Sequence, residues 1–173
     1  MSNTAQALVG IIMGSDSDLD VMSEAAKVFD DFKVAYEVRI ISAHRTPDAM
    51  TAYAAEAKGR GLQLIIAGAG GSAHLPGMTA SHTLLPVLAV PIKRAETDHE
   101  ALWSNIKMPP GIPLATLPEN GAKNAALLAI EILALQDPAL ATAYEQFRDK
   151  QATTVVEVDN KIQNQGWQQS VKS

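Results

Sequence analysis

With 173 residues, a formal net charge of −5 and no cysteine, the chain has the length of one domain with one buried core, and it excludes disulfides and thiolate chemistry. Hydrophobic residues make up 47% of it and aromatic residues only 5%, which favours helices packed on a buried sheet over an aromatic-rich β-sandwich. No basic stripe appears and no apolar run approaches the roughly 20 residues that span a bilayer, so neither nucleic acid nor a membrane is an expected partner. We expect a cytoplasmic protein, because the first residues do not resemble a signal peptide and the absence of cysteine is compatible with the cytosol.

Apolar runs that stop at glycine or polar residues alternate along the chain with stretches of helical spacing. In chain order they predict a strand at 7–13, a helix capped by Ser17, a strand at 34–41, a helix from Thr46-Pro47 to about 58, a strand at 62–67, a short helix at about 78–83, a strand at 85–91, a helix at 97–107, a strand at 114–117, and helices at 122–135 and 138–162. This alternation predicts an α/β fold in which a parallel sheet is covered by helices on both faces, with right-handed crossovers. We expect a single domain over 1–173, with its core at about 7–135 and a polar, disordered tail at about 163–173.

The expected helix at 122–135 is apolar over most of its circumference, and such a helix is normally buried. One small domain does not easily cover it, so we expect it at a subunit interface. The final helix, at 138–162, is long enough to reach a neighbouring subunit.

Small and polar residues follow the first expected strand, at 14–18. Ligands of parallel α/β sheets bind beyond the carboxyl ends of the strands, and free N–H groups at a helix N-terminus attract anions. Ser15 and Ser17 therefore suit an anion, and Asp18 suits a sugar hydroxyl. The alternative is a loop with a serine cap and two acidic residues that favour the helix dipole.

The second expected strand ends at Ser42, His44 and Arg45. A guanidinium is suited to bidentate recognition of phosphate, and an imidazole can move protons near neutral pH. The alternative is that Thr46 caps the next helix while His44 and Arg45 are only solvated.

A glycine-rich segment follows the third expected strand, at 68–77. It contains Gly70, Gly71, Ser72, Ala73 and His74. Glycines at such a place indicate positive φ angles or a close approach of backbone to a ligand, and the alternative is a flexible turn. Three strand ends with such residues together favour a functional site.

Other chemistries find less support in the sequence. His82 and His99 fall in helical stretches and are expected to be incidental. No cluster has a convincing spacing for a metal site, and no serine stands in a nucleophile elbow.

Three motifs carry a resemblance to a known family: MGSDSD at 13–18, SAHRTPD at 42–48 and AGAGGSAHLPGM at 67–78. In this order and spacing the chain resembles the class I N5-carboxyaminoimidazole ribonucleotide mutases of purine biosynthesis, the catalytic subunit family of phosphoribosylaminoimidazole carboxylase, over about 7–135. The resemblance implies a flavodoxin-like, three-layer α/β/α subunit, a homo-octamer with active sites between subunits, and an isomerase that needs no metal, biotin or ATP. It also implies a functional link to the ATP-dependent synthetase that makes the substrate.

The resemblance assigns roles to the motif residues. His44 is implied as the catalytic acid/base. The implied reaction moves a carboxylate from an exocyclic nitrogen to a ring carbon of an aminoimidazole ribonucleotide. The implied substrate contacts are Ser15 and Ser17 for phosphate and ribose, Asp18 for ribose, Ser42 and Arg45 for phosphate, and Gly70, Gly71, Ser72, Ala73 and His74 around the carboxylate that moves.

The sequence departs from this family pattern in two loops. Pro110 stands where a basic residue is usual, and a proline and a lysine precede the NAALLA run at 124–129. The second feature resembles the class II relatives, which carboxylate aminoimidazole ribonucleotide directly with CO2. Direct carboxylation is therefore one alternative activity, and a non-catalytic module that binds nucleotide phosphate is another.

Overall fold

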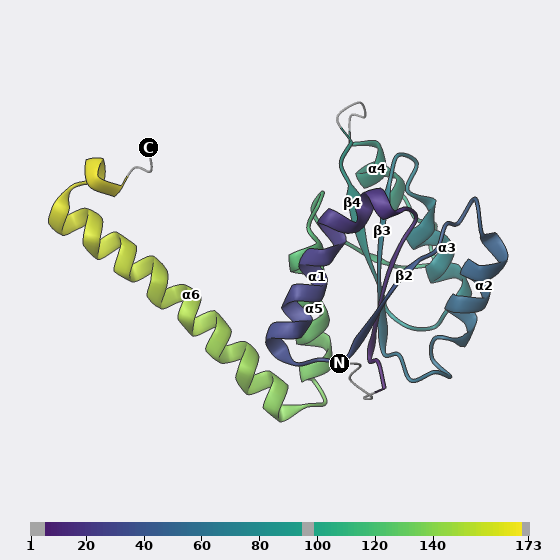
Figure 1. The fold of residues 1–173 in the computed structure, drawn as a ribbon, viewed down its shortest axis with the longest axis horizontal. Coiled ribbons are helices and arrows are strands. Elements are labelled where there is room, and N and C mark those ends of the chain that lie inside the picture. Colours follow the sequence, from purple (N-terminus) through teal and green to yellow (C-terminus); the bar gives the residue numbers. More distant parts are fainter. Residues whose placement is uncertain (1–5, 95–98, 171–173) are drawn as a thin grey trace. The chain divides into compact units, whose positions relative to one another are not determined.

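The computed structural model describes residues 6–94 and 99–170. The chain divides into two compact units, residues 1–129 and 130–173. The first unit contains the sheet and most of the helices (Figure 1).

Five parallel strands form the sheet of the first unit, in the order β2-β1-β3-β4-β5. Their bounds are Val9–Met13 for β1, Tyr36–Ile40 for β2, Leu64–Gly70 for β3, Val87–Ile92 for β4 and Ala115–Thr116 for β5. This order is that of flavodoxin-like folds, whose ligands bind where β1 and β3 diverge at their carboxyl ends. The predicted parallel α/β fold is confirmed.

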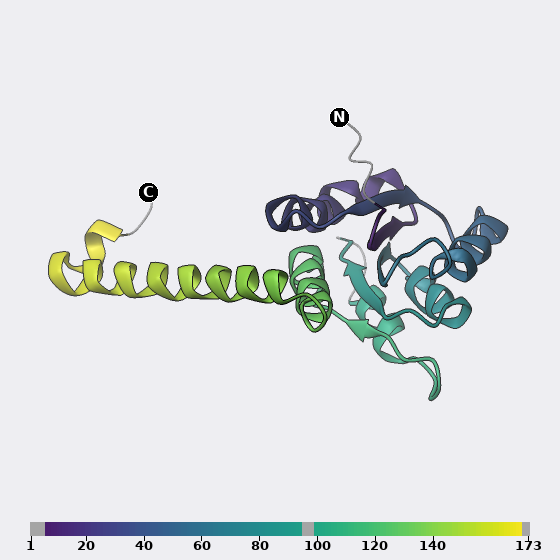
Figure 2. The same cartoon turned by 90° about the horizontal axis from the view of Figure 1, so that it is seen from below.

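Helices lie on both sides of this sheet. They are η1 (Asp16–Asp18), α1 (Leu19–Phe32), α2 (Pro47–Glu56), α3 (His74–His82), α4 (Glu100–Ile106) and α5 (Ala122–Ala134). Figures 1 and 2 show α1 and residues 122–129 of α5 on one side, and α2 and α3 on the other. The helix predicted at 97–107 corresponds to α4, and its first two residues lie outside the described part of the chain.

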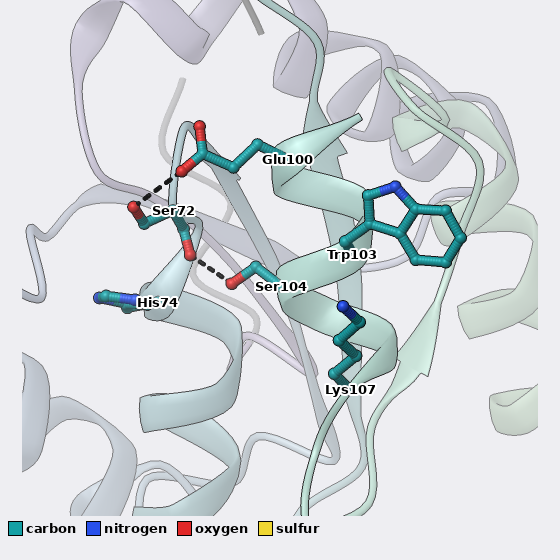
Figure 3. Close-up of a pocket in the computed structure, with 6 residues that line it drawn as sticks. All are labelled: Ser72, His74, Glu100, Trp103, Ser104 and Lys107. Atoms are coloured by element: carbon teal, nitrogen blue, oxygen red, sulfur yellow. Dashed lines mark hydrogen bonds between the residues drawn. The ribbon is translucent and has the colours of Figure 1, made fainter. Parts of the chain in front are cut away.

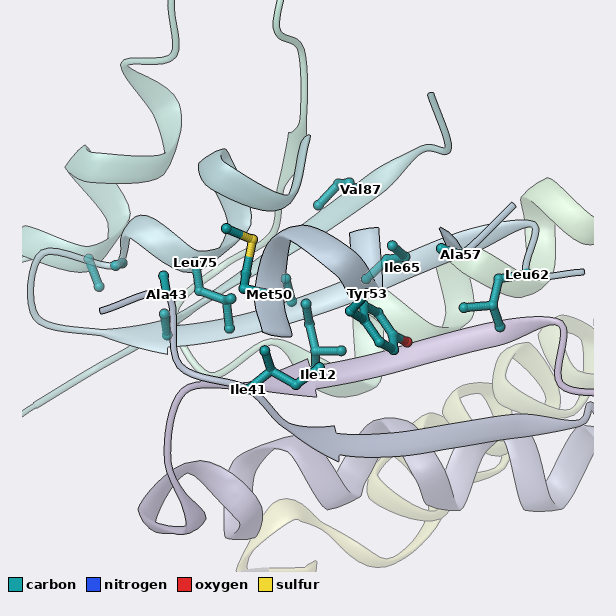
Figure 4. Close-up of a cluster of buried hydrophobic side chains, with 14 residues drawn as sticks. Ile12, Ile41, Ala43, Met50, Tyr53, Ala57, Leu62, Ile65, Leu75 and Val87 are labelled. Atoms are coloured by element: carbon teal, nitrogen blue, oxygen red, sulfur yellow. The ribbon is translucent and has the colours of Figure 1, made fainter. Parts of the chain in front are cut away.

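A buried apolar cluster holds α2 and α3 against the sheet (Figure 4). Met50 and Tyr53 of α2 and Leu75 of α3 pack against Ile12 of β1 and Ile65 of β3. This packing fixes the strand and helix ends that carry the polar motifs.

The glycine-rich segment is more regular than the sequence predicts. Strand β3 continues through Gly70, because Gly68 and Gly70 pair with β4, and α3 begins at His74 rather than near Met78. Gly68 is needed inside the strand, since a Cβ there would lie 2.3 Å from the Met22 sulfur. Only residues 71–73 of the glycine-rich segment up to His74 therefore lie outside β3 and α3.

The second unit contains the end of α5, α6 (Pro138–Gln165) and η2 (Trp167–Ser170). The Asp137 side chain caps α6 by accepting hydrogen bonds from the backbone N–H groups of Ala139 and Leu140, at 3.0 and 3.1 Å. The predicted start of this helix is confirmed. The prediction of a disordered tail is wrong for 163–170, because the helix runs three residues beyond the predicted end and a 3-10 turn follows.

Candidate active site

A pocket of about 350 Å³ lies at the carboxyl ends of β1, β3 and β4, beside the segment that follows β2. It is lined by Gly14, Ser15, Asp18, Ser42, Ala43, His44, Arg45, Ala69, Gly70, Ala73, His74, Leu75 and Arg94. The three segments that the sequence singles out therefore meet in one pocket.

The first segment forms a short 3-10 turn at the pocket rim. Ser15 is its N-cap, and its oxygen accepts from the Ser17 backbone N–H at 3.3 Å and from the Ser17 hydroxyl at 3.1 Å. The prediction that Ser17 caps the following helix is wrong, because η1 intervenes and α1 begins at Leu19. Ser15 lines the pocket, whereas Ser17 is exposed beside it.

Asp18 is a buried carboxylate in the pocket wall, with 3% of its surface exposed. Its Oδ1 accepts a hydrogen bond from Nη2 of Arg94, which reaches it from beyond the end of β4. Burial raises the pKa of the Asp18 carboxyl above its usual value, and the charge and hydrogen bond of Arg94 oppose that rise.

The second segment is a tight turn that directs Arg45 across the pocket. The Ser42 hydroxyl accepts from the Arg45 backbone N–H at 3.1 Å, and Nη2 of Arg45 donates to the Gly14 carbonyl at 2.5 Å. Thr46 stands before the first residue of α2 but its side chain does not cap the helix; its hydroxyl instead bonds to the Ser42 backbone N–H and C=O, both at 3.0 Å. This turn fixes Ser42 and Arg45 next to the end of β1.

His44 and His74 form a pair. Nε2 of His44 lies 2.8 Å from Nδ1 of His74, and the two rings meet edge to face with centroids 5.0 Å apart. At that distance one nitrogen carries the proton and the other accepts it. The pair can therefore hold or pass a single proton within the pocket.

The turn after β3 has left-handed backbone at Gly71 (φ 59°) and Ala73 (φ 42°). Helix α4 holds it from outside: the Ser72 hydroxyl donates to Glu100 Oε1 at 3.2 Å, and the Ser104 hydroxyl donates to the Ser72 carbonyl (Figure 3). Gly71 and Ser72 do not line the pocket themselves.

The Ser72 side chain faces a neighbouring, more open hollow. That hollow, of about 540 Å³, is lined by Ser72, His74, Glu100, Trp103, Ser104 and Lys107 (Figure 3). We place the candidate site in the pocket that contains the strand ends, because the cations and the histidine pair converge there.

The sequence interpretation missed Arg94, which lines the pocket. Arg94 lies two residues beyond the end of β4, so the rule that ligands bind at the carboxyl ends of strands also applies to it. The two remaining histidines lie elsewhere: His82 contacts the Met78 carbonyl, and His99 pairs with Glu119.

Within 6–94 and 99–170, no group of three or more metal-binding side chains lies close enough to hold an ion. Over that same part of the chain, no helix has the length and apolar character required to cross a membrane.

Comparisons with known proteins agree with this architecture. Residues 8–154 match the family model described as AIR carboxylase. The chain is 52% identical to an N5-carboxyaminoimidazole ribonucleotide mutase of Pyrococcus abyssi, covering 92% of each, and 52% identical to one of Vibrio cholerae, covering 88% of this chain and 96% of that protein. It is also 52% identical to a phosphoribosylaminoimidazole carboxylase of Schizosaccharomyces pombe, but spans only 29% of that protein's length.

A solved structure shares the fold. The crystal structure of Treponema denticola PurE superposes with a TM-score of 0.84 at 31% identity, covering 90% of this chain and 98% of that one.

Proposed function

Because the chain belongs to the AIR carboxylase family, we propose that it is an N5-carboxyaminoimidazole ribonucleotide mutase of purine biosynthesis. The reaction converts the N-carboxylated aminoimidazole ribonucleotide to the ring-carboxylated isomer. The observation that carries the proposal is the meeting of Arg45, the buried Asp18 and the His44–His74 pair in one pocket.

The phosphate of the substrate binds at the end of β1. Ser15 and Ser42 offer hydroxyls there, and the Arg45 guanidinium offers a planar cation suited to two phosphate oxygens. The bond from Arg45 to the Gly14 carbonyl keeps this cation at the pocket wall before substrate arrives. Asp18, on the same wall, accepts a hydrogen bond from a ribose hydroxyl.

The migrating carboxylate lies against Gly70 and Ala73, the two residues of the turn after β3 that line the pocket, beside the N-terminus of α3. Unpaired backbone N–H groups of a first helical turn, together with the helix dipole, favour a negative charge. The left-handed backbone at Gly71 and Ala73 shapes this turn, and α4 fastens it.

His44 moves the proton. When the C–N bond of the N-carboxyl group breaks, the electron pair remains on the exocyclic nitrogen, which takes a proton from His44, and CO2 is released. The ring carbon then attacks CO2, and His44 removes the proton from that carbon, so that the imidazole returns to its starting state. Hydrogen bonding to His74 sets which His44 nitrogen carries the proton.

Retention of CO2 requires that the pocket close around it. Holding CO2 next to the ring replaces a dilute second reactant by a high effective concentration. In the single chain the pocket is open enough that both His44 and His74 are exposed, and we therefore place neighbouring subunits of a homo-octamer over it. The same assembly would cover α6, of whose described side chains only Leu140 is buried.

The proposal extends to the cellular setting. We place the protein in the cytoplasm, where its reaction follows that of an ATP-dependent synthetase that supplies the N-carboxylated substrate.

Direct carboxylation with CO2 is the less favoured alternative. The curated relatives that this chain matches over 92% to 96% of their own length carry the mutase name. The carboxylases among the relatives are much larger proteins, of which the chain spans 28% to 30%.

The test is to mix the protein with the N-carboxylated ribonucleotide and to follow the ring-carboxylated product. We expect a rate far above the uncatalysed one. Arg45→Met should raise KM by about tenfold or more, because a charged phosphate contact is lost, whereas Arg39→Met, at an exposed site of β2, should not. Absence of any rate enhancement by the wild-type protein would overturn the proposal.

A further inference from the structure

Arg94 connects two parts of the pocket that come from different strand ends. Its Nη2 donates to Oδ1 of Asp18 and, at 3.3 Å, to the Ser17 hydroxyl, both in the turn after β1. Its own backbone follows β4. Arg94, 76 residues from Asp18 in the sequence, thus holds in place a carboxylate that lines the pocket.

Gly70 makes room for this arrangement. A Cβ at Gly70 would lie 2.7 Å from Nε of Arg94 and 3.2 Å from the Ile92 carbonyl. The guanidinium therefore passes over a backbone position that has no side chain, at the end of β3. A larger residue at 70 would displace Arg94 from Asp18.

Because the Asp18 carboxylate is buried, it depends on a neighbouring cation to stay ionised more than an exposed carboxylate would. Its side chain is only 4% exposed, whereas that of Arg94 is 39% exposed. A buried carboxylate without a partner favours its protonated form, which would donate a hydrogen bond rather than only accept. The Arg94 charge, with a smaller contribution from Arg45, keeps Asp18 an acceptor. A carboxylate has about four lone-pair sites, so the bonds from Arg94 and from the Ser15 backbone leave capacity for a ligand hydroxyl.

We propose that Arg94 is a positioning residue for ribose recognition: it acts through Asp18, holding that carboxylate ionised and oriented to accept from a ribose hydroxyl of the substrate. The inference rests on the proposed function. It makes Arg94 a determinant of specificity for a ribosyl over a deoxygenated sugar, and not a direct ligand of the phosphate or the carboxylate.

The experiment measures, by calorimetry, the affinities of the ring-carboxylated ribonucleotide and of its 2′,3′-dideoxy analogue. Wild-type protein should bind the ribonucleotide about tenfold or more tighter, as expected for a hydrogen bond to a charged group. Arg94→Met should lose most of this preference by weakening the ribonucleotide alone. Asp18→Asn should do the same, and the double variant should be no worse than either single one, because both remove one interaction.

Two further variants separate this role from a general structural one. Arg94→Lys keeps the charge and should regain part of the preference for the ribonucleotide. Arg39→Met removes an exposed arginine of β2 and should leave both affinities unchanged. Circular dichroism of each variant checks the fold.

Several outcomes would overturn the inference. If Arg94→Met lowered the affinity for both nucleotides equally, Arg94 would bind the phosphate or carboxylate directly. If it left both affinities unchanged, Arg94 would have no part in nucleotide recognition. Additive losses in the double variant would separate Arg94 from Asp18. Because these are binding measurements, failure of the wild-type protein to isomerise its substrate would contradict the proposed function without deciding the role of Arg94.

Discussion

Replacing His44 by asparagine is the sharpest test of the proposed chemistry. The shorter amide does not reach Nδ1 of His74, which Nε2 of His44 contacts at 2.8 Å, and it cannot take or give a proton at neutral pH. The phosphate-binding turn is held by Ser42, Arg45 and Thr46 and needs no contact from the His44 side chain. The change should therefore remove proton transfer and leave substrate binding intact.

Because His44 is assigned to proton transfer and not to substrate binding, the expected loss is in kcat. General acid–base catalysis contributes about 10²–10⁴ in rate, equivalent to about 3–5 kcal/mol of activation free energy, so kcat should fall by that factor while KM stays within about threefold. Steady-state turnover, with substrate affinity measured separately, gives both quantities. His82→Asn, at an exposed histidine outside the pocket, is the matched control and should retain full activity.

A His44→Asn variant that retains kcat within about threefold of wild type would contradict the assignment of proton transfer to His44. A variant that loses activity only through KM would also contradict it, because His44 would then be a binding residue.

Three further changes test the fold and the site. Gly68→Ala forces a Cβ against the buried Met22 side chain and should destabilise the protein by about 1–3 kcal/mol; an unchanged urea midpoint would contradict the close packing. Ser104→Ala removes the hydrogen bond to the Ser72 carbonyl and loosens the turn after β3. More CO2 should then exchange with solution during turnover, while KM changes little. Unchanged exchange would show that α4 does not hold this turn in place. Because burial raises the pKa of Asp18, the folded protein keeps a proton on this carboxyl at pH values where the unfolded chain has lost it. The stability of the wild-type protein relative to Asp18→Asn should therefore fall as pH rises from about 4 through the folded pKa. Urea titrations with the opposite slope would mean that the charge of Arg94 outweighs burial.

The sheet and the general place of the site could be predicted from the sequence. Runs such as those at 9–13 and 64–67 are apolar on both faces of the strand, as is typical of buried parallel strands, and all their residues except Gly10 are core hydrophobics. Parallel strands bring their carboxyl ends to one edge, so polar residues after each strand meet there. This rule correctly placed Ser15, Ser42 and His44 in one pocket.

The ends of several elements could not be predicted, because tertiary contacts decide them. Glycines usually indicate a turn, but Gly68 lies inside β3 since α1 packs a methionine against it. Pro76 lies within α3, because a proline in the first turn of a helix loses no helical hydrogen bond. The cap at Ser15 rather than Ser17 depends on a short 3-10 turn that the sequence pattern does not distinguish from the start of an α-helix.

The partners of the site residues were also beyond the sequence. Nothing in the local pattern pairs His44 with His74, 30 residues later, or Asp18 with Arg94. Such pairs arise from the strand order, which brings β1 between β2 and β3 and places β4 next to β3.

Isotope labelling can follow the carboxyl group itself from substrate to product. The protein would be given ribonucleotide that carries ¹³C in its N-carboxylate, in a solution of unlabelled CO2 and bicarbonate, and the product would be examined by mass spectrometry in the first turnovers. A mutase that releases and recaptures CO2 in a closed pocket should place the label on the ring carbon of nearly all product molecules. Product that carries unlabelled carboxylate from solution would contradict transfer within the pocket and indicate direct carboxylation.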